Sequence, residues 1–114
     1  MNMQKNKSHN LLYLLELTPS SEHVLEKIAS QNRLEQIFYE CAQTLDFEID
    51  SCDIMFDFVA ITLYVKPSVN IDDLVNNLKQ QTSDEFIKEL SEFKQFCKDG
   101  SLWNVDDNLE LLHS

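Results

Sequence analysis

The sequence predicts an α+β domain, because two stretches with helical periodicity alternate with short runs of β-forming residues. The chain has 114 residues, of which 43% are hydrophobic, so one domain with its own core is expected. It contains one glycine and two prolines, which leaves few turn signals. A many-stranded all-β fold is therefore disfavoured.

The first half of the chain predicts a strand followed by a helix. We expect a buried strand at residues 9–17, because a short apolar run ends there at Thr-Pro-Ser. A helix is expected next, capped by Ser20 or Ser21 and continuing through periodic apolar positions to Leu45. The polar stretch at residues 30–33 would lie inside this helix and mark a bend.

Two strands and a second helix are expected after it. Residues 46–53 alternate between acidic or polar and apolar side chains, as in an edge strand with one wet face. Residues 55–65 are rich in β-branched and aromatic side chains, which favours a central strand. Asn70 and Asp73 resemble a capping box at the start of a helix that Gly100 would end.

A last strand at residues 101–113 completes the order β-α-β-β-α-β. Two helices and four strands in this order fit a ferredoxin-like split βαβ sandwich, with both helices on one face of an antiparallel sheet. No repeat or linker divides the chain, so residues 1–114 are expected to form a single domain.

The charge of the chain limits its partners. The formal net charge is −11, with nine basic and twenty acidic residues, whereas nucleic-acid surfaces neutralise phosphates with Lys and Arg. We expect weak or absent nucleic-acid binding, and a protein partner that is basic or DNA-binding. One alternative stays open, in which dimerisation gathers lysines such as Lys66 and Lys79 into a groove for single-stranded or hairpin DNA.

No residue pattern indicates a cofactor, a metal site or a membrane segment. The cysteines and histidines lack ligand spacing, and the cysteines are expected as free thiols of a cytoplasmic protein. The longest apolar run, residues 11–15, is too short to span a bilayer. A metal-independent enzyme that uses Asp57 or acidic helix starts is a further hypothesis. The acidic pairs at residues 72–73 and 84–85 are expected at helix starts, and the pair at 106–107 in a turn.

Four segments in the correct order resemble the small single-tyrosine HUH transposases, whose relatives include the REP-associated tyrosine transposases. The segments are HNLLYLLEL at residues 9–17, LDFEIDSCDIMFDFVAITLYVKPS at 45–68, LVNNLKQQTS at 74–83 and GSLW at 100–103. The resemblance implies the same fold, and a dimer that cuts and rejoins single-stranded DNA. It also implies a metal held by two histidines on one strand and a nucleophilic tyrosine on a helix after the last strand.

The chain departs from this family at the chemical positions. Phe58 and Ala60 stand where the resemblance places the two metal-binding histidines, and neither side chain can ligate a metal. Met55-Phe56-Asp57 replaces the family's Met-Pro-Asp. We expect the domain to lack the C-terminal tyrosine helix, since no tyrosine of the sequence occupies that place. No catalytic residue, metal or cofactor is therefore predicted, and we do not expect an enzyme.

Side-chain alternation along the strand at residues 55–65 predicts an interaction face. Its odd-numbered residues would face the helices, and Phe56, Phe58, Ala60 and Tyr64 would share the opposite face. We interpret the chain as a catalytically inactive, transposase-derived protein that acts as a dimeric interaction or regulatory module. The dimer would meet at or beside Phe58 and tighten as salt relieves repulsion between acidic subunits. Alternatively, the N-terminal segment or the final strand covers this face within the monomer.

Overall fold

The computed structural model describes residues 10–97 and 99–114, so His9, expected to open the first strand, lies outside the described residues. The predicted order β-α-β-β-α-β is confirmed, with one short 3₁₀ helix added before the last strand. The elements are β1 (Leu11–Pro19), α2 (Ile28–Leu45), β2 (Glu48–Ile54), β3 (Val59–Val65), α3 (Ile71–Glu89), η1 (Ser91–Phe96) and β4 (Trp103–His113).

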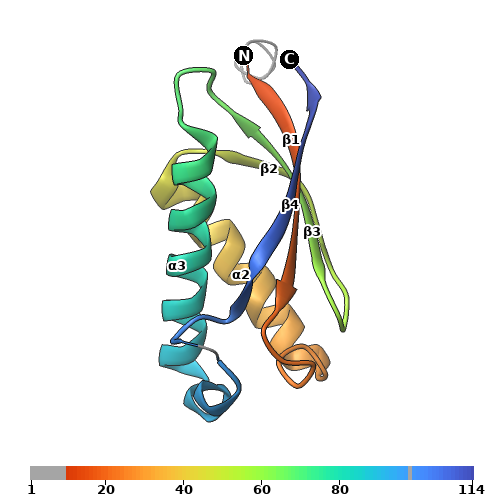
Figure 1. Ribbon diagram of the computed structural model, residues 1–114, viewed down its shortest axis with the longest axis vertical. Helices are drawn as coiled ribbons and strands as arrows, with labels where there is room; N and C mark the ends of the chain where they lie inside the picture. Colours follow the sequence, from red (N-terminus) through yellow and green to blue (C-terminus); the bar gives the residue numbers. More distant parts are fainter. Residues whose placement is uncertain (1–9, 98) are drawn as a thin grey trace.

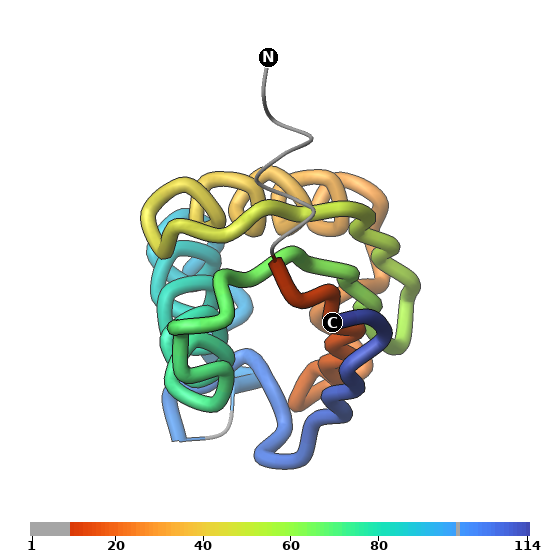
Figure 2. The backbone as a smooth tube through the Cα atoms, turned by 90° about the horizontal axis from the view of Figure 1, so that it is seen from above, coloured from red at the N-terminus to blue at the C-terminus, as the bar shows by residue number. Residues whose placement is uncertain are grey.

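The four strands form one antiparallel sheet in the order β2-β3-β1-β4. The predicted central position of the third strand and edge position of the second are both confirmed. Both helices cover the same face of the sheet (Figure 1), and the view along the strands shows the opposite face without a helix (Figure 2). None of the helices among the described residues has the length and apolar character needed to cross a membrane.

The core lies between this sheet and the two helices. The odd-numbered residues of β3 are almost fully buried, as predicted, and β1 adds Leu15 and Leu17 to the same face. Phe38 of α2 and Phe86 of α3 are the largest fully buried side chains above them. Alternation along the strands therefore separates a helix-covered face from an open face.

The first helix begins later than predicted. Neither Ser20 nor Ser21 caps it, because Ser20 Oγ donates instead to the carbonyl oxygens of Phe96 and Ser101. Residues 20–27 form turns that still bury Val24 completely, and α2 starts at Ile28. The polar stretch at 30–33 consequently belongs to the first turns of the helix and not to a bend in its middle.

The second helix begins as predicted and ends earlier. The Asn70 side chain accepts a hydrogen bond from the Asp73 backbone N–H at 3.1 Å. The helix stops at Glu89, about ten residues before Gly100, and η1 then turns Phe93 into contact with Phe86. The pair at 84–85 lies inside α3 and the pair at 106–107 inside β4, so their predicted places at a helix start and in a turn were wrong.

The strand predicted at residues 55–65 is shorter than expected. Residues 55–58 form the turn of the β2–β3 hairpin, closed by the Met55 backbone N–H, which donates to the Phe58 carbonyl oxygen at 2.9 Å. Phe56 is 67% exposed in this turn and does not belong to the strand. Its predicted place beside Ala60 and Tyr64 on one strand face was therefore wrong.

Candidate functional site

The open face of the sheet, opposite the helices, holds the positions at which the resemblance places catalysis. Ala60 lies in its middle, paired with Glu16 of β1 on one side and Asp53 of β2 on the other. Thr62, one step further along β3, pairs with Ser51. Cross-strand partners share a face, so these side chains are neighbours. The same pairings add Leu12, Leu14, Glu48, Tyr64, Asn108 and Glu110 to the open face.

Phe58, directly before β3, lines a pocket at one end of the open face. The pocket has a volume of about 350 Å³ and is called the Phe58 pocket below. Its lining residues are Glu16, Thr18, Phe58, Asp106, Asp107 and Asn108. A ring beside carboxylates and small polar groups favours an organic cation more than an anion.

The side chains at positions 58 and 60 do not fit the metal of the HUH transposases. A phenyl ring and a methyl group offer no lone pair, although the two positions lie one pleat apart as the resemblance requires. Among residues 10–97 and 99–114, no group of three His, Cys, Asp or Glu side chains converges as a metal site. No reaction step through a metal can be derived from this donor set.

The open face is acidic. The four strands contain no Lys or Arg. They carry Glu16, Glu48, Asp50, Asp53, Asp106 and Glu110, and also Asp107, which pairs with buried Leu17 and with Lys79 of α3 and so lies on the helix-covered side. Asp50 is the extra residue of a bulge in β2. Its Oδ2 accepts a hydrogen bond from Thr62 Oγ1 at 3.0 Å, so its side chain turns towards this face. The predicted aromatic interaction face is thus an acidic face, in which Ala60 and Tyr64 are half-buried and one ring lines the Phe58 pocket.

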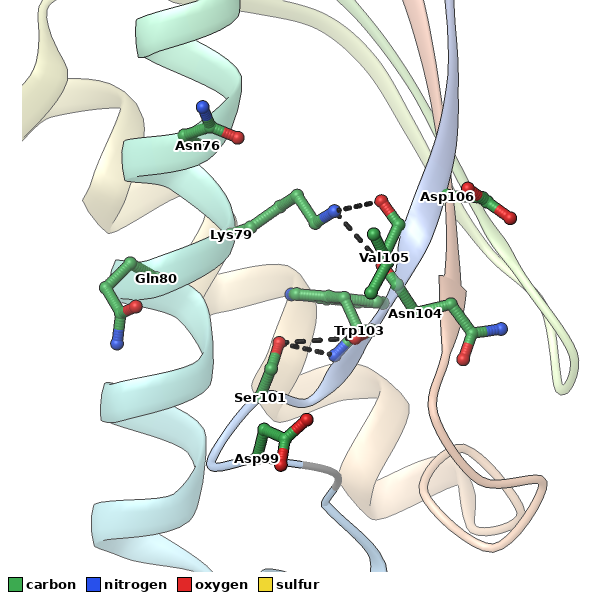
Figure 3. A pocket seen from close by; sticks show the side chains of 9 residues that line it. All are labelled: Asn76, Lys79, Gln80, Asp99, Ser101, Trp103, Asn104, Val105 and Asp106. Atoms are coloured by element: carbon green, nitrogen blue, oxygen red, sulfur yellow. Dashed lines mark hydrogen bonds between the residues drawn. The ribbon is translucent and has the colours of Figure 1, made fainter.

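The two lysines suggested for a nucleic-acid groove are both engaged by the protein. Lys79 Nζ donates to the carbonyl oxygens of Asn104 and Val105 and to Asp107 Oδ2 at 2.9 Å (Figure 3). Lys66 Nζ donates to Asp46 Oδ2 at 2.7 Å. Each charge is therefore paired with a carboxylate, and the structure does not bring the two lysines together in one groove of the chain.

The junction between α3 and β4 explains two of the four matched segments. The buried Trp103 Nε1–H donates to Thr82 Oγ1, and the Leu102 backbone N–H donates to Ser83 Oγ, both at 2.9 Å. We use the name α3–β4 junction for Lys79, Thr82, Ser83, Leu102 and Trp103. Matched segments 74–83 and 100–103 thus bind each other, a pairing that sequence reasoning missed. A groove of about 590 Å³ beside them has a mixed lining of amide, charged and apolar side chains and one hydroxyl (Figure 3).

The thiols provide no nucleophile at neutral pH. Burial raises the pKa of Cys41 to about 11 and that of Cys52 to about 12, so both stay protonated. Burial also raises the pKa of Cys97. All three are free, as predicted.

Comparison with known proteins places this geometry in a family. The sequence model of the IS200-like transposases matches residues 7–106, which is most of the chain. The chain belongs to the IS200-like transposase family. The HUH-type resemblance and the predicted fold are thereby confirmed. No curated protein matches the sequence.

Two solved structures share the IS200-like fold. A protein from Deinococcus radiodurans assigned as a transposase has a TM-score of 0.82 and 23% identity, covering 90% of this chain and 79% of its own. A REP-associated tyrosine transposase bound to a REP hairpin has a TM-score of 0.64 and 8% identity, covering 91% of this chain and 57% of its own. At these identities the likeness concerns the fold alone.

Proposed function

We propose that the chain is a catalytically inactive IS200-like protein that acts in the cytoplasm as a protein-interaction or regulatory module. The observation that carries the proposal is the pair Phe58 and Ala60 on the open face, where a strand-cutting relative would need metal ligands. Three free cysteines support a reducing compartment.

Two physical arguments support the loss of DNA cleavage. A metal that activates a phosphodiester stabilises the developing charge by several kcal/mol, in the manner of a Lewis acid, and no ligand at positions 58 and 60 can hold one. The open face is also acidic, and like charges repel the phosphates that a nuclease must bind. Both arguments concern the open face. Without cleavage, we assign a binding role to this face.

A strand-transfer assay tests the proposal. The protein is incubated with labelled single-stranded hairpin DNA and Mg²⁺ or Mn²⁺, beside an active member of the family as a positive control. We expect neither a cleaved strand nor a covalent protein–DNA adduct. A defined cleavage product, or an adduct that survives denaturing electrophoresis, would contradict the proposal.

Homodimerisation is part of the proposal, as the resemblance implies. Two copies that meet through the open face would bring like charges together, so such a dimer should tighten as salt rises. The edge strand β4 offers a second route through backbone pairing, because it ends the sheet of the described residues. Light scattering of the wild type and of Phe58→Asp at low and high salt distinguishes the two. Loss of the dimer in the variant supports the open face, persistence supports pairing at a sheet edge, and a wild-type monomer throughout contradicts both.

Residual binding of single-stranded or hairpin DNA is the second candidate. It is favoured by one observation, the shared fold of a transposase bound to a REP hairpin. The pairing of Lys66 and Lys79 with carboxylates argues against it. An electrophoretic shift with hairpin DNA at physiological salt decides the matter. We expect no complex at roughly micromolar protein, the range in which nonspecific binders begin to bind.

A further inference from the structure

Basic residues are distributed unevenly between the two layers of the domain, whereas acidic residues occur in both. Every basic residue described in the structure lies on a helix or a connecting segment, and none lies on a strand. These basic residues are Lys27, Arg33, Lys66, Lys79, Lys88 and Lys94. The acidic open face is therefore not neutralised by cations of its own sheet. Seven of the twenty acidic residues lie on the strands, and the sheet itself offers them no Lys or Arg.

The carboxylates on this face come from β1, β2 and β4, and β3 carries none. In the row through Ala60, Asp53 and Glu16 lie two strand spacings apart, roughly 10 Å. Glu110 of β4 follows one step further along, beside Leu14. Such an array is too dispersed for one metal ion. It matches an extended chain that presents several cationic side chains.

The Phe58 pocket gives this surface an anchor. Glu16 and Asp106 line it together with the Phe58 ring, and Figure 3 shows Asp106 on the side of β4 away from Lys79. Asp107 is already paired with Lys79. A guanidinium group stacks on an aromatic ring and binds carboxylates with two parallel hydrogen bonds, which an ammonium group cannot do.

We propose that the open face binds an extended, arginine-rich segment of a partner protein, with one guanidinium group seated in the Phe58 pocket. The inference rests on the proposed function and names the partner's chemistry. Charge complementarity carries it, since a cationic segment is attracted to this face at low salt, whereas a second copy of the face or a nucleic acid is repelled until salt screens the charges.

Fluorescence anisotropy with a labelled peptide of alternating arginine and threonine tests the inference on the full chain. Matched peptides replace arginine with lysine or with neutral citrulline. We expect the arginine peptide to bind best, the citrulline peptide not to bind, and binding to weaken as salt rises. Glu16→Gln with Asp53→Asn should weaken binding about fivefold, and Phe58→Leu about threefold.

The control variant, Asp84→Asn with Glu92→Gln, makes the same charge change on α3 and η1 and should bind like the wild type. Equal loss in both double variants would indicate a nonspecific charge effect and overturn the inference. Equal binding of the lysine and arginine peptides would overturn the anchor. Peptide binding and DNA cleavage are separate measurements. An active nuclease that binds the peptide contradicts only the proposed function, whereas an inactive chain that ignores the peptide contradicts only this inference.

Discussion

The two faces of the sheet differ in what they retain of the IS200-like family. On the helix-covered face, matched segments 74–83 and 100–103 form the α3–β4 junction, and the buried Trp103 and Thr82 side chains hydrogen-bond each other. On the open face, Phe58 and Ala60 replace the expected metal ligands, and carboxylates surround them. This contrast supports the proposal that the chain keeps the family's scaffold and not its chemistry.

This difference has a physical reason. Buried side chains at the α3–β4 junction are held by packing and by the cost of leaving a polar group without a partner. Side chains on an exposed sheet face can change at little cost in stability once they have no substrate to bind. Under this proposal, the family assignment informs about the packing on the helix-covered face more than about the function of the open face.

The largest expected effect comes from removing the α3–β4 junction's aromatic ring. Trp103 is 2% exposed, so Trp103→Ala should lower the free energy of unfolding by about 3–5 kcal/mol. Val105→Ala is the control on the same strand, because Val105 is 92% exposed and should change it by less than about 0.5 kcal/mol. Urea denaturation measures both. Equal effects would contradict the role assigned to the α3–β4 junction.

A smaller effect is expected from the hydrogen bond alone. Thr82→Val keeps the shape of the side chain and leaves the buried Trp103 N–H without an acceptor, which should cost about 1–3 kcal/mol. In the background of Trp103→Phe, which has no N–H, the same change should cost clearly less. A double-mutant cycle by urea denaturation measures this coupling, and strictly additive costs would show that the bond contributes nothing.

Sequence patterns predicted the fold because strong local signals agreed with the tertiary structure. Alternation identified the buried residues of β3, and Asn70 gave the start of α3. The start of α2 was missed because Ser20 is used in long-range hydrogen bonds to Phe96 and Ser101. A side chain that could cap a helix gives no sign in the sequence that it will donate its hydrogen bond to a distant carbonyl group instead.

The candidate site was predicted only in part. The positions of Phe58 and Ala60 followed from the resemblance. The hairpin turn at residues 55–58 contains no Gly or Pro that would reveal it, and Phe56 was therefore wrongly predicted to lie on the strand. The acidic character of the open face depends on pairing between four strands. Net charge alone could not show that the strands would carry carboxylates and no Lys or Arg.

The smallest expected stability effect concerns the ion pair that joins the two helices. Arg33 of α2 donates to the Glu89 carboxylate of α3, and this hydrogen bond lowers the pKa of Glu89. The resulting stabilisation is present above the ordinary pKa of a glutamate and is lost as the pH falls through the lowered folded-state pKa. Glu89→Gln should therefore destabilise the protein slightly at neutral pH and not at strongly acidic pH.

Glu110→Gln provides the contrast, since it removes a like charge from the open face and should leave stability unchanged or slightly raised at neutral pH. Urea denaturation over a pH series compares the two variants. If Glu110→Gln destabilises the protein as much as Glu89→Gln, the open-face carboxylates have structural partners. The contrast between the two layers would then fail.

The central proposal is that Phe58 and Ala60 occupy the positions of two metal-binding histidines, as the resemblance implies, and that the chain therefore binds no metal there. The most direct test is Co²⁺ binding, followed by visible absorption, in the wild type and in Phe58→His with Ala60→His. Two imidazoles one pleat apart, with Glu16 paired to position 60, should bind Co²⁺ and show a ligand-field band. The wild type should show no band and no saturable binding. Stoichiometric Co²⁺ binding by the wild type, or a double variant that folds and binds none, would contradict the account.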